Sequence, residues 1–196
     1  MTKIELPDKK YKIILVDPPW RFETWSDKGK EKAPEQHYQT MSLKELKKLP
    51  VKKIADDDCA LFIWTTSSML EKTFVLLKAW GFTYKSVAFN WQKKTTTGKD
   101  AFGLGFWTRL SSEFCLLATK GSPKCLSNNV EQVVYAKLRE HSRKPDEVRT
   151  RIVRLMGDLP RIELFARQRM KGWDVWGLEA PRQTQTLLIT EGKKCQ

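Results

Sequence analysis

Four consecutive residues combine a carboxylate, a rigid turn and an indole: Asp17, Pro18, Pro19 and Trp20. The two prolines fix two φ angles and disfavour the helical region for Asp17 and Pro18. They also remove two N–H donors, so the turn presents mainly acceptors, namely the Asp17 carboxylate and the Pro18 carbonyl. With the Trp20 indole as a flat apolar surface beside them, these acceptors suit a planar base that carries an exocyclic amine. The other interpretation is a rigid strand-exit turn with a tryptophan that packs on the core.

A short apolar run must position this turn. Residues 13–16 are aliphatic without interruption, which predicts a strand buried on both faces in a parallel sheet. A carboxylate at the C-terminal end of such a strand lies where open α/β sheets bind their ligands.

A second candidate is Lys144, which stands in the run Ser142-Arg143-Lys144-Pro145-Asp146-Glu147. This pattern predicts a loop that delivers Lys144, followed by a helix from Asp146 to Met156 that ends at Gly157. A lysine is a point charge that can bind a carboxylate. The alternative is a lysine that only faces solvent.

Residues 93–110 form a long segment in which basic and aromatic side chains alternate. They do not connect a strand to a helix, so their glycines do not indicate a dinucleotide loop. Phosphate attraction combined with base stacking favours contact with a nucleic acid, whereas the other interpretation is a flexible loop between two strands. The candidate contacts are Lys93, Lys94, Lys99, Trp107 and Arg109. We expect this loop, and a similar one over residues 21–37, to be mobile without substrate.

The remaining pattern alternates strands with helices. Strands are expected at residues 59–65, 85–92, 113–119, 133–135 and 161–167, and Asp56 to Asp58 indicate a turn. Helices are expected at 43–49, with Ser42 and Glu45 as a capping box, and from about 67 to Trp80, ending at Gly81.

Composition narrows the class of protein. A chain of 196 residues suits one α/β domain, and its net charge of +13 favours a polyanionic partner. The four cysteines show no CxxC spacing and only two histidines are present, so no metal site is expected. Scattered thiols favour a reducing, cytoplasmic location. No signal peptide is seen, and no apolar run approaches the roughly 20 residues of a membrane span, so no membrane partner is expected.

Several motifs together resemble the DPPW branch of the S-adenosylmethionine-dependent adenine-N6 methyltransferases, over roughly residues 11 to 180. They are Asp17-Pro18-Pro19-Trp20, His37-Tyr38-Gln39-Thr40-Met41, Lys144-Pro145-Asp146, Glu163-Leu164-Phe165-Ala166-Arg167 and Gly172-Trp173-Asp174 with Trp176-Gly177-Leu178-Glu179. The resemblance implies a Rossmann-like α/β methyltransferase fold with a mostly parallel seven-stranded sheet. It also implies a permuted motif order, with the catalytic motif first and the cofactor motif last. Residues 1–180 then form one methyltransferase domain and 181–196 a C-terminal tail.

The same resemblance assigns roles to individual residues. S-adenosylmethionine is the implied cofactor, and adenine N6 in a nucleic acid, DNA in preference to RNA, is the implied acceptor. The catalytic residues are Asp17, Pro18, Pro19, Trp20 and Tyr38, and those at the cofactor are Asp17, Lys144, Phe165, Arg167 and Glu179. Leu178 replaces the family's usual asparagine, which puts one polar contact to the cofactor in doubt.

Other interpretations stay open at this point. One is a catalytically silent nucleic-acid-binding subunit, although such relatives typically lose the aspartate or the prolines. Another is an RNA adenosine N6-methyltransferase. A third is methylation of cytosine N4 or a protein glutamine, whose enzymes usually carry Ser-Pro-Pro-Tyr or Asn-Pro-Pro-Tyr. Little room remains for a target-recognition domain, which suggests low sequence specificity, or a homodimer or partner subunit that supplies it.

Overall fold

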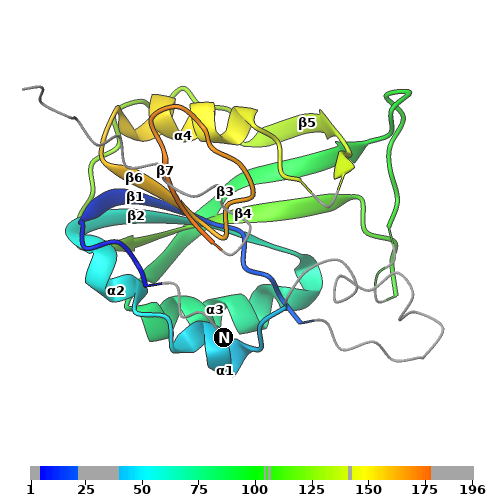
Figure 1. Ribbon diagram of the computed structural model, residues 1–196. Helices are drawn as coiled ribbons and strands as arrows, with labels where there is room; N and C mark the ends of the chain where they lie inside the picture. The colour runs from blue at the N-terminus through cyan, green and yellow to red at the C-terminus, as the bar shows by residue number, and fades with distance from the viewer. Residues whose placement is uncertain (1–4, 22–39, 104, 106, 141–142, 178–196) are drawn as a thin grey trace, which may run out of the picture.

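The computed structural model describes residues 5–21, 40–103, 105, 107–140 and 143–177, and within them seven strands form one twisted sheet (Figure 1). The strand order is β5-β3-β4-β2-β1-β6-β7. The strands are β1 (Tyr11–Val16), β2 (Ala55–Thr65), β3 (Thr83–Lys94), β4 (Ser112–Lys120), β5 (Val133–Lys137), β6 (Arg161–Leu164) and β7 (Asp174–Trp176). All neighbours pair in parallel except β4, which is antiparallel to β2 and β3. The predicted fold class, a mostly parallel seven-stranded α/β sheet, is confirmed.

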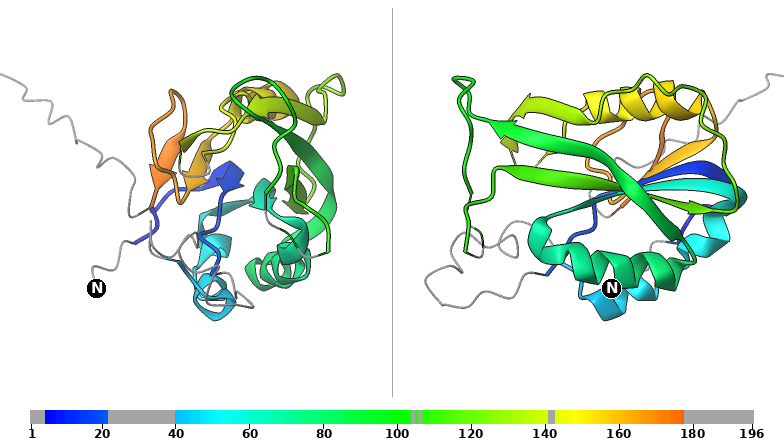
Figure 2. Two further views of the ribbon diagram at one scale, coloured as in Figure 1. Left: turned by 90° about the vertical axis from the view of Figure 1, so that its right-hand side faces the viewer. Right: turned by 180° about the vertical axis from the view of Figure 1, so that it is seen from behind.

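Helices cover both faces of the sheet (Figures 1 and 2). They are α1 (Leu43–Lys47), α2 (Val51–Ile54), the 3-10 turn η3 (Ser67–Met69), α3 (Leu70–Trp80) and α4 (Glu147–Met156). The first four elements pack on one face and α4 packs on the other, and each face has its own apolar core. No helix in the described residues is long and apolar enough to span a bilayer.

Local sequence signals account for the ends of two helices. The Ser42 hydroxyl accepts a hydrogen bond from the Glu45 amide, and the Glu45 carboxylate accepts one from the Ser42 amide, which completes the predicted capping box. Gly81 ends α3 with a φ of 82°, a left-handed conformation that favours glycine.

Alternation along the strands decides which side chains can reach the site. On β1, Ile14 and Val16 join the core under α1–α3, whereas Ile13 and Leu15 join the core under α4. The period of two continues beyond the strand, so Asp17 emerges on the α4 face. By the same rule, Lys93 follows Trp91 of β3 onto that face.

Several sequence-based expectations about element boundaries are wrong, including the loop start at residue 93, because β3 continues through Lys94. Asp56 to Asp58 are not a turn, because β2 begins at Ala55, where it pairs with Tyr11. Lys120 supports this extension by donating to the Asp56 carbonyl at 2.9 Å. The strand expected through Arg167 ends at Leu164, because Phe165 turns into the left-handed region with a φ of 60°.

Candidate active site

The turn after β1 is fastened to the chain that follows the next loop. Trp20 N donates to the Pro18 carbonyl at 2.8 Å, and Met41 N donates to the Pro19 carbonyl at 2.7 Å. Arg21 N in turn donates to the Met41 carbonyl at 3.1 Å. The Pro18 carbonyl keeps a second lone pair for a further donor. Backbone hydrogen bonds therefore fix the turn, whereas its role as an acceptor site stays a prediction.

Trp20 does not offer the open stacking face that the sequence suggested. Its side chain is 5% exposed and belongs to the apolar core that includes Val16 and Met69. The indole Nε1 has no hydrogen-bond partner within the described part of the chain. The indole therefore anchors the turn to the core and positions Asp17.

The Asp17 carboxylate is paired with Lys144, the second candidate residue from the sequence, although 127 residues separate the two. Lys144 Nζ donates to Asp17 Oδ2 at 2.9 Å and lies 3.3 Å from Glu113 Oε2. Glu113 also pairs with Lys93, so two carboxylates and two ammonium groups alternate. Lys144 further lies over the Trp64 ring, 5.8 Å from its centroid. The pairing excludes the interpretation of Lys144 as a solvent-facing charge.

Charge compensation keeps these buried groups ionised. Burial alone lowers the pKa of Lys144, but the nearby Asp17 and Glu113 carboxylates outweigh burial, and the net pKa is raised. For Glu113, burial raises the pKa, whereas Lys144 and Lys93 lower it, and the net pKa is lowered. Both side chains therefore carry their charges at neutral pH.

The segment that carries Lys144 is held by a second network, centred on Asp146. The Asp146 carboxylate accepts hydrogen bonds from Arg139, Arg143, Arg149 and Gln168. Three guanidinium groups lower the pKa of Asp146 even though burial opposes them. Asp146 thus ties the loop before α4 to the segment that follows β6.

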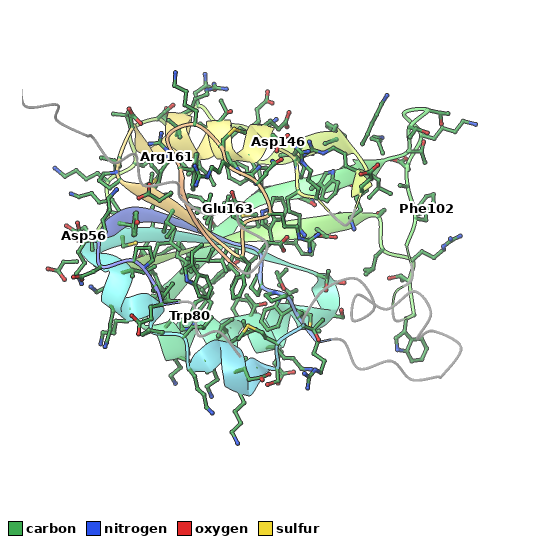
Figure 3. The ribbon with its side chains drawn as sticks, viewed as in Figure 1. Asp56, Trp80, Phe102, Asp146, Arg161 and Glu163 are labelled. Carbon is green, nitrogen blue, oxygen red and sulfur yellow. The ribbon has the colours of Figure 1, made fainter. Side chains whose placement is uncertain are left out.

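Arg149 continues the network into the sheet. Its guanidinium forms a two-point ion pair with Glu163 on β6, with both distances 2.7 Å, and Figure 3 shows Glu163 between α4 and the strands. Sequence reasoning missed this pair. The available signal was Glu163 itself, because a carboxylate between the apolar residues Ile162 and Leu164 requires a buried cation.

Phe165 and the end of β7 form a tight backbone contact at the same sheet edge. The φ of Phe165 is 60°, and its ring meets the Trp176 ring edge to face at 5.4 Å. A Cβ on Gly177 would lie 3.0 Å from the Phe165 Cα and 3.2 Å from the Ala166 nitrogen. Such strain is typical of ligand-binding positions. Arg167, two residues further on, is half-buried and engaged in a contact of its own.

Of the segment expected as a loop at 93–110, Lys93 and Lys94 belong to β3, and the described residues beyond them form a hairpin that projects from the sheet (Figures 1 and 3). Gly103 and Leu110 exchange two backbone hydrogen bonds, and Lys94 pairs with Asp100 at 2.7 Å. Arg109 lies over the Phe102 ring at 5.7 Å. Trp107 and Lys99 are exposed, and Trp107 is fully so. Lys93 is separate from this group because it lies on the α4 face beside Glu113.

Some predicted site residues lie outside the described residues. They are Tyr38 and most of loop 21–37, Leu178 and Glu179, and the tail 181–196. Among the residues that are described, no group of three or more His, Cys, Asp or Glu side chains could hold a metal ion.

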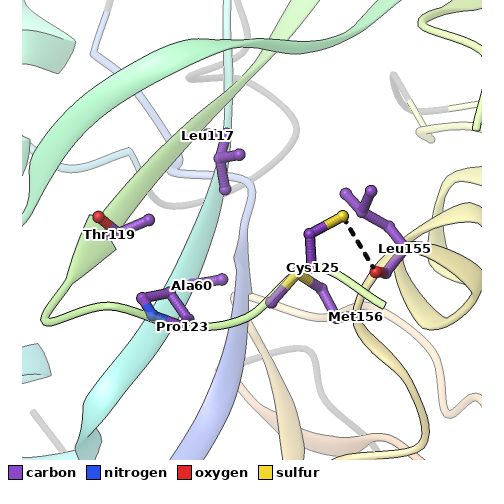
Figure 4. A pocket seen from close by; sticks show the side chains of 7 residues that line it. All are labelled: Ala60, Leu117, Thr119, Pro123, Cys125, Leu155 and Met156. Atoms are coloured by element: carbon purple, nitrogen blue, oxygen red, sulfur yellow. Dashed lines mark hydrogen bonds between the residues drawn. The ribbon is translucent and has the colours of Figure 1, made fainter. Parts of the chain in front are cut away.

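A cavity of about 100 Å³ lies between β2, β4, the segment that follows β4 and the C-terminal end of α4 (Figure 4). Its lining includes Leu117, Cys125 and Met156, and the Cys125 thiol donates to the Leu155 carbonyl. It contains no ion pair and takes no part in the chemistry at Asp17.

The acceptor turn and the buried lysine lie at the carboxyl edge of a mostly parallel sheet, which is where open α/β sheets bind their ligands. Residues 11–179 match the MT-A70 family, and the chain belongs to it. The protein is therefore a methyltransferase, as the motifs predicted.

Similar proteins come from bacteria and eukaryotes. The Type II methyltransferase M.MunI of a Mycoplasma species is 37% identical over 195 residues, which covers 90% of this chain and 81% of that protein. An N(6)-adenosine-methyltransferase MT-A70-like protein of Arabidopsis thaliana is 33% identical, over 79% of this chain and 21% of its own length. The human N(6)-adenosine-methyltransferase catalytic subunit METTL3 is 30% identical, over 81% of this chain and 26% of its own length. The chain thus spans most of the bacterial relative but about a quarter or less of these eukaryotic ones.

Proposed function

We propose that this enzyme transfers the methyl group of S-adenosylmethionine to the N6 amine of adenine in a nucleic acid, in DNA in preference to RNA. The observation that carries the proposal is the rigid acceptor turn Asp17-Pro18, which emerges at the carboxyl edge of the sheet and is paired with the buried Lys144.

The Asp17 carboxylate and the Pro18 carbonyl are proposed to overcome the low nucleophilicity of the adenine amine. The lone pair of an adenine amine is delocalised into the ring, so the amine is a poor nucleophile. The Asp17 carboxylate and the Pro18 carbonyl accept its two N–H groups and favour a pyramidal nitrogen whose lone pair points away from the turn. Because the prolines and the Met41 contacts fix both acceptors beforehand, little reorganisation is needed during the reaction.

The residues at the sheet edge fit S-adenosylmethionine. When bound, this cofactor supplies an electrophilic methyl group on a sulfonium ion. Lys144 provides a fixed ammonium for its carboxylate, and the Phe165–Gly177 contact provides a closely packed backbone edge for its adenosine. Arg167 at the adenosine, Glu179 at the ribose and Tyr38 beside the target base complete the proposal.

The nucleic acid is proposed to lie along the hairpin that carries Lys94, Lys99, Trp107 and Arg109. Lys99 and Arg109 are exposed cations near the exposed Trp107 indole, and Lys94 is partly exposed beside them; this combination suits phosphate contact and base stacking. A duplex substrate must flip its adenine out of the stack, at a cost of a few kcal/mol.

DNA is favoured because the bacterial type II methyltransferase aligns with nine-tenths of this chain. RNA is the second candidate, since several relatives are named as N(6)-adenosine methyltransferases. The intact Asp17-Pro18-Pro19-Trp20 motif speaks against a catalytically silent subunit. A second copy or a partner subunit is proposed to supply sequence specificity.

A cytoplasmic location is part of the proposal as well. The three free thiols of the described chain favour the reducing environment of the cytoplasm.

The test is to incubate the purified protein with radiolabelled S-adenosylmethionine and DNA or RNA oligomers, and to identify the modified nucleoside by mass spectrometry. The expected product is N6-methyladenine, with more label in DNA than in RNA. Label in another nucleoside, or none in either polymer, would overturn the proposal.

A further inference from the structure

Two neighbouring lysines on β3, Lys93 and Lys94, pair with different carboxylates, one buried and one exposed. The Lys93 side chain is 18% exposed, pairs with the buried Glu113 and lies 5.3 Å from the centroid of the Trp91 ring. The Lys94 side chain is 27% exposed, pairs with Asp100, whose side chain is 62% exposed, and lies 5.4 Å from the centroid of the Tyr135 ring. Because successive side chains of a strand point to opposite faces, one lysine faces the active site and the other faces outward.

Lys93 is the last member of a row of alternating charges, which runs from Asp17 through Lys144 and Glu113 to Lys93. The Lys144 ammonium thus has two carboxylates that compete for it. Lys93 neutralises one of them, Glu113, and so reduces the electrostatic attraction between Glu113 and Lys144. Without the Lys93 charge, Lys144 is the remaining cation that compensates the buried Glu113 carboxylate in this row. Lys144 then moves toward Glu113 and its ion pair with Asp17 weakens.

We propose that Lys93 is a positioning residue for methyl transfer, which acts through Glu113 on Lys144, and that it is not a contact to nucleic-acid phosphate. This inference rests on the proposed function, because it takes Lys144 as the group that holds the cofactor carboxylate and Asp17 as the acceptor of the amine.

The first test compares Lys93→Met, Lys93→Arg and Lys94→Met in the full chain. Lys93→Met removes the charge and keeps the length of the side chain, and we expect turnover to fall about 10- to 100-fold, as for a displaced catalytic constellation. Affinity for S-adenosylmethionine should fall as well, whereas nucleic-acid affinity and its salt dependence should not change. Lys93→Arg should restore most of the turnover.

Lys94→Met is the matched control with the opposite result. It should weaken nucleic-acid binding and reduce the salt slope by roughly 0.7–0.9, the value for one phosphate contact, while cofactor affinity stays constant. If Lys93→Met instead reduces the salt slope as Lys94→Met does, Lys93 is a phosphate contact and the inference is wrong. Circular dichroism verifies folding, and Lys93→Gln replaces the Met variant if that variant unfolds.

The second test is a double-mutant cycle with Glu113→Gln. If Lys93 acts only through Glu113, Lys93→Met should have almost no further effect on turnover or cofactor affinity in the Glu113→Gln background. An equal loss in both backgrounds would show that Lys93 acts independently of Glu113.

The cycle also separates this inference from the proposed function. A wild-type enzyme that binds S-adenosylmethionine but methylates neither DNA nor RNA overturns the proposed function. Calorimetric titration of the cofactor against wild type and the variants of the cycle then decides the inference, with the same coupling expected in the dissociation constants.

Discussion

At the scale of single residues, the site depends on one carboxylate that is held in a rigid turn. Replacing it by an isosteric amide, Asp17→Asn, should reduce methyl transfer by about 10²-fold or more, because a preorganised charged acceptor is removed. Radiolabel incorporation measures the loss, and thermal unfolding serves as the folding control. If the variant keeps more than about a tenth of wild-type turnover, Asp17 is not the acceptor of the adenine amine.

Residue types indicated which charged groups meet at the site better than they indicated side-chain directions. Asp17 and Lys144 were both identified from their local patterns, but their direct contact joins residues 127 apart and left no local signal. The sequence left the position of Trp20 open, because an indole after a turn suits a ligand surface and a core equally well, and the structure shows the core position. The direction of Lys93 could have been found, since alternation places it on the same face as the buried Trp91.

At the scale of elements, the N-terminus of α4 and the Lys144 segment depend on the Asp146 network. Asp146→Asn should lower the free energy of unfolding by about 1–3 kcal/mol near neutral pH, because charged donors lose their acceptor. The folded-state pKa of Asp146 lies below its ordinary value of 3.8, so its contribution is present above that value and is lost as the pH falls through the folded pKa.

Denaturant unfolding of wild type and Asp146→Asn at several pH values tests this. The difference between the two proteins should be largest near neutral pH and should shrink as the pH falls below 3.8. A difference that is constant down to acid pH would show that Asp146 contributes through packing and not through its charge.

The projecting hairpin is an element with a separate role. The triple variant Lys94→Ala, Lys99→Ala and Arg109→Ala should weaken binding to DNA, because it removes three cations of the hairpin that lie outside the Asp17–Lys144 cluster. The slope of log affinity against log salt should flatten by roughly 0.7–0.9 for each phosphate that the variant no longer neutralises. Fluorescence anisotropy at several salt concentrations measures both. Wild-type affinity and slope in the triple variant would place the nucleic acid on another surface.

The boundaries of elements were predictable where a cap or an apolar run marks them. Ser42 with Glu45, and Gly81 after Trp80, define their helix ends through backbone hydrogen bonds formed locally. The extension of β2 through Asp56 to Asp58 was not predictable, because three acidic residues normally favour a turn. That extension is supported by distant groups, namely the pairing of Ala55 with Tyr11 and the Lys120 ammonium.

At the scale of the whole molecule, the resemblance to the methyltransferase family predicted a mostly parallel seven-stranded sheet, whereas no sequence pattern predicted the full strand order. The antiparallel direction of β4 follows from the hairpin between β3 and β4, because a hairpin reverses the chain. The parallel arrangement of β1, β2, β6 and β7 brings Asp17, Phe165 and Gly177 to one edge, and only the assembled sheet shows this.

Because residues from several strands meet at that edge, binding of the cofactor should stabilise the entire domain. A ligand present at about 100 times its dissociation constant adds about 2.7 kcal/mol to the free energy of unfolding. For a domain of this size, that corresponds to a rise of on the order of 5–10 °C in Tm. Differential scanning fluorimetry with S-adenosylmethionine measures this rise without any nucleic acid.

Lys144→Met provides the reference for the same experiment. Removal of its ammonium from the cofactor carboxylate should cost about 1.5–3 kcal/mol of binding free energy, so the Tm shift should largely disappear at the ligand concentration that stabilises the wild type. The Tm of the unliganded variant, compared with that of the unliganded wild type, separates this effect from any change in stability itself. Because Lys144 reaches the site from the loop before α4 and contacts Asp17 at the end of β1, an unchanged Tm shift would mean that the cofactor binds away from this junction. Lys144 would then serve only to connect the loop before α4 to the turn after β1 through its ion pair with Asp17.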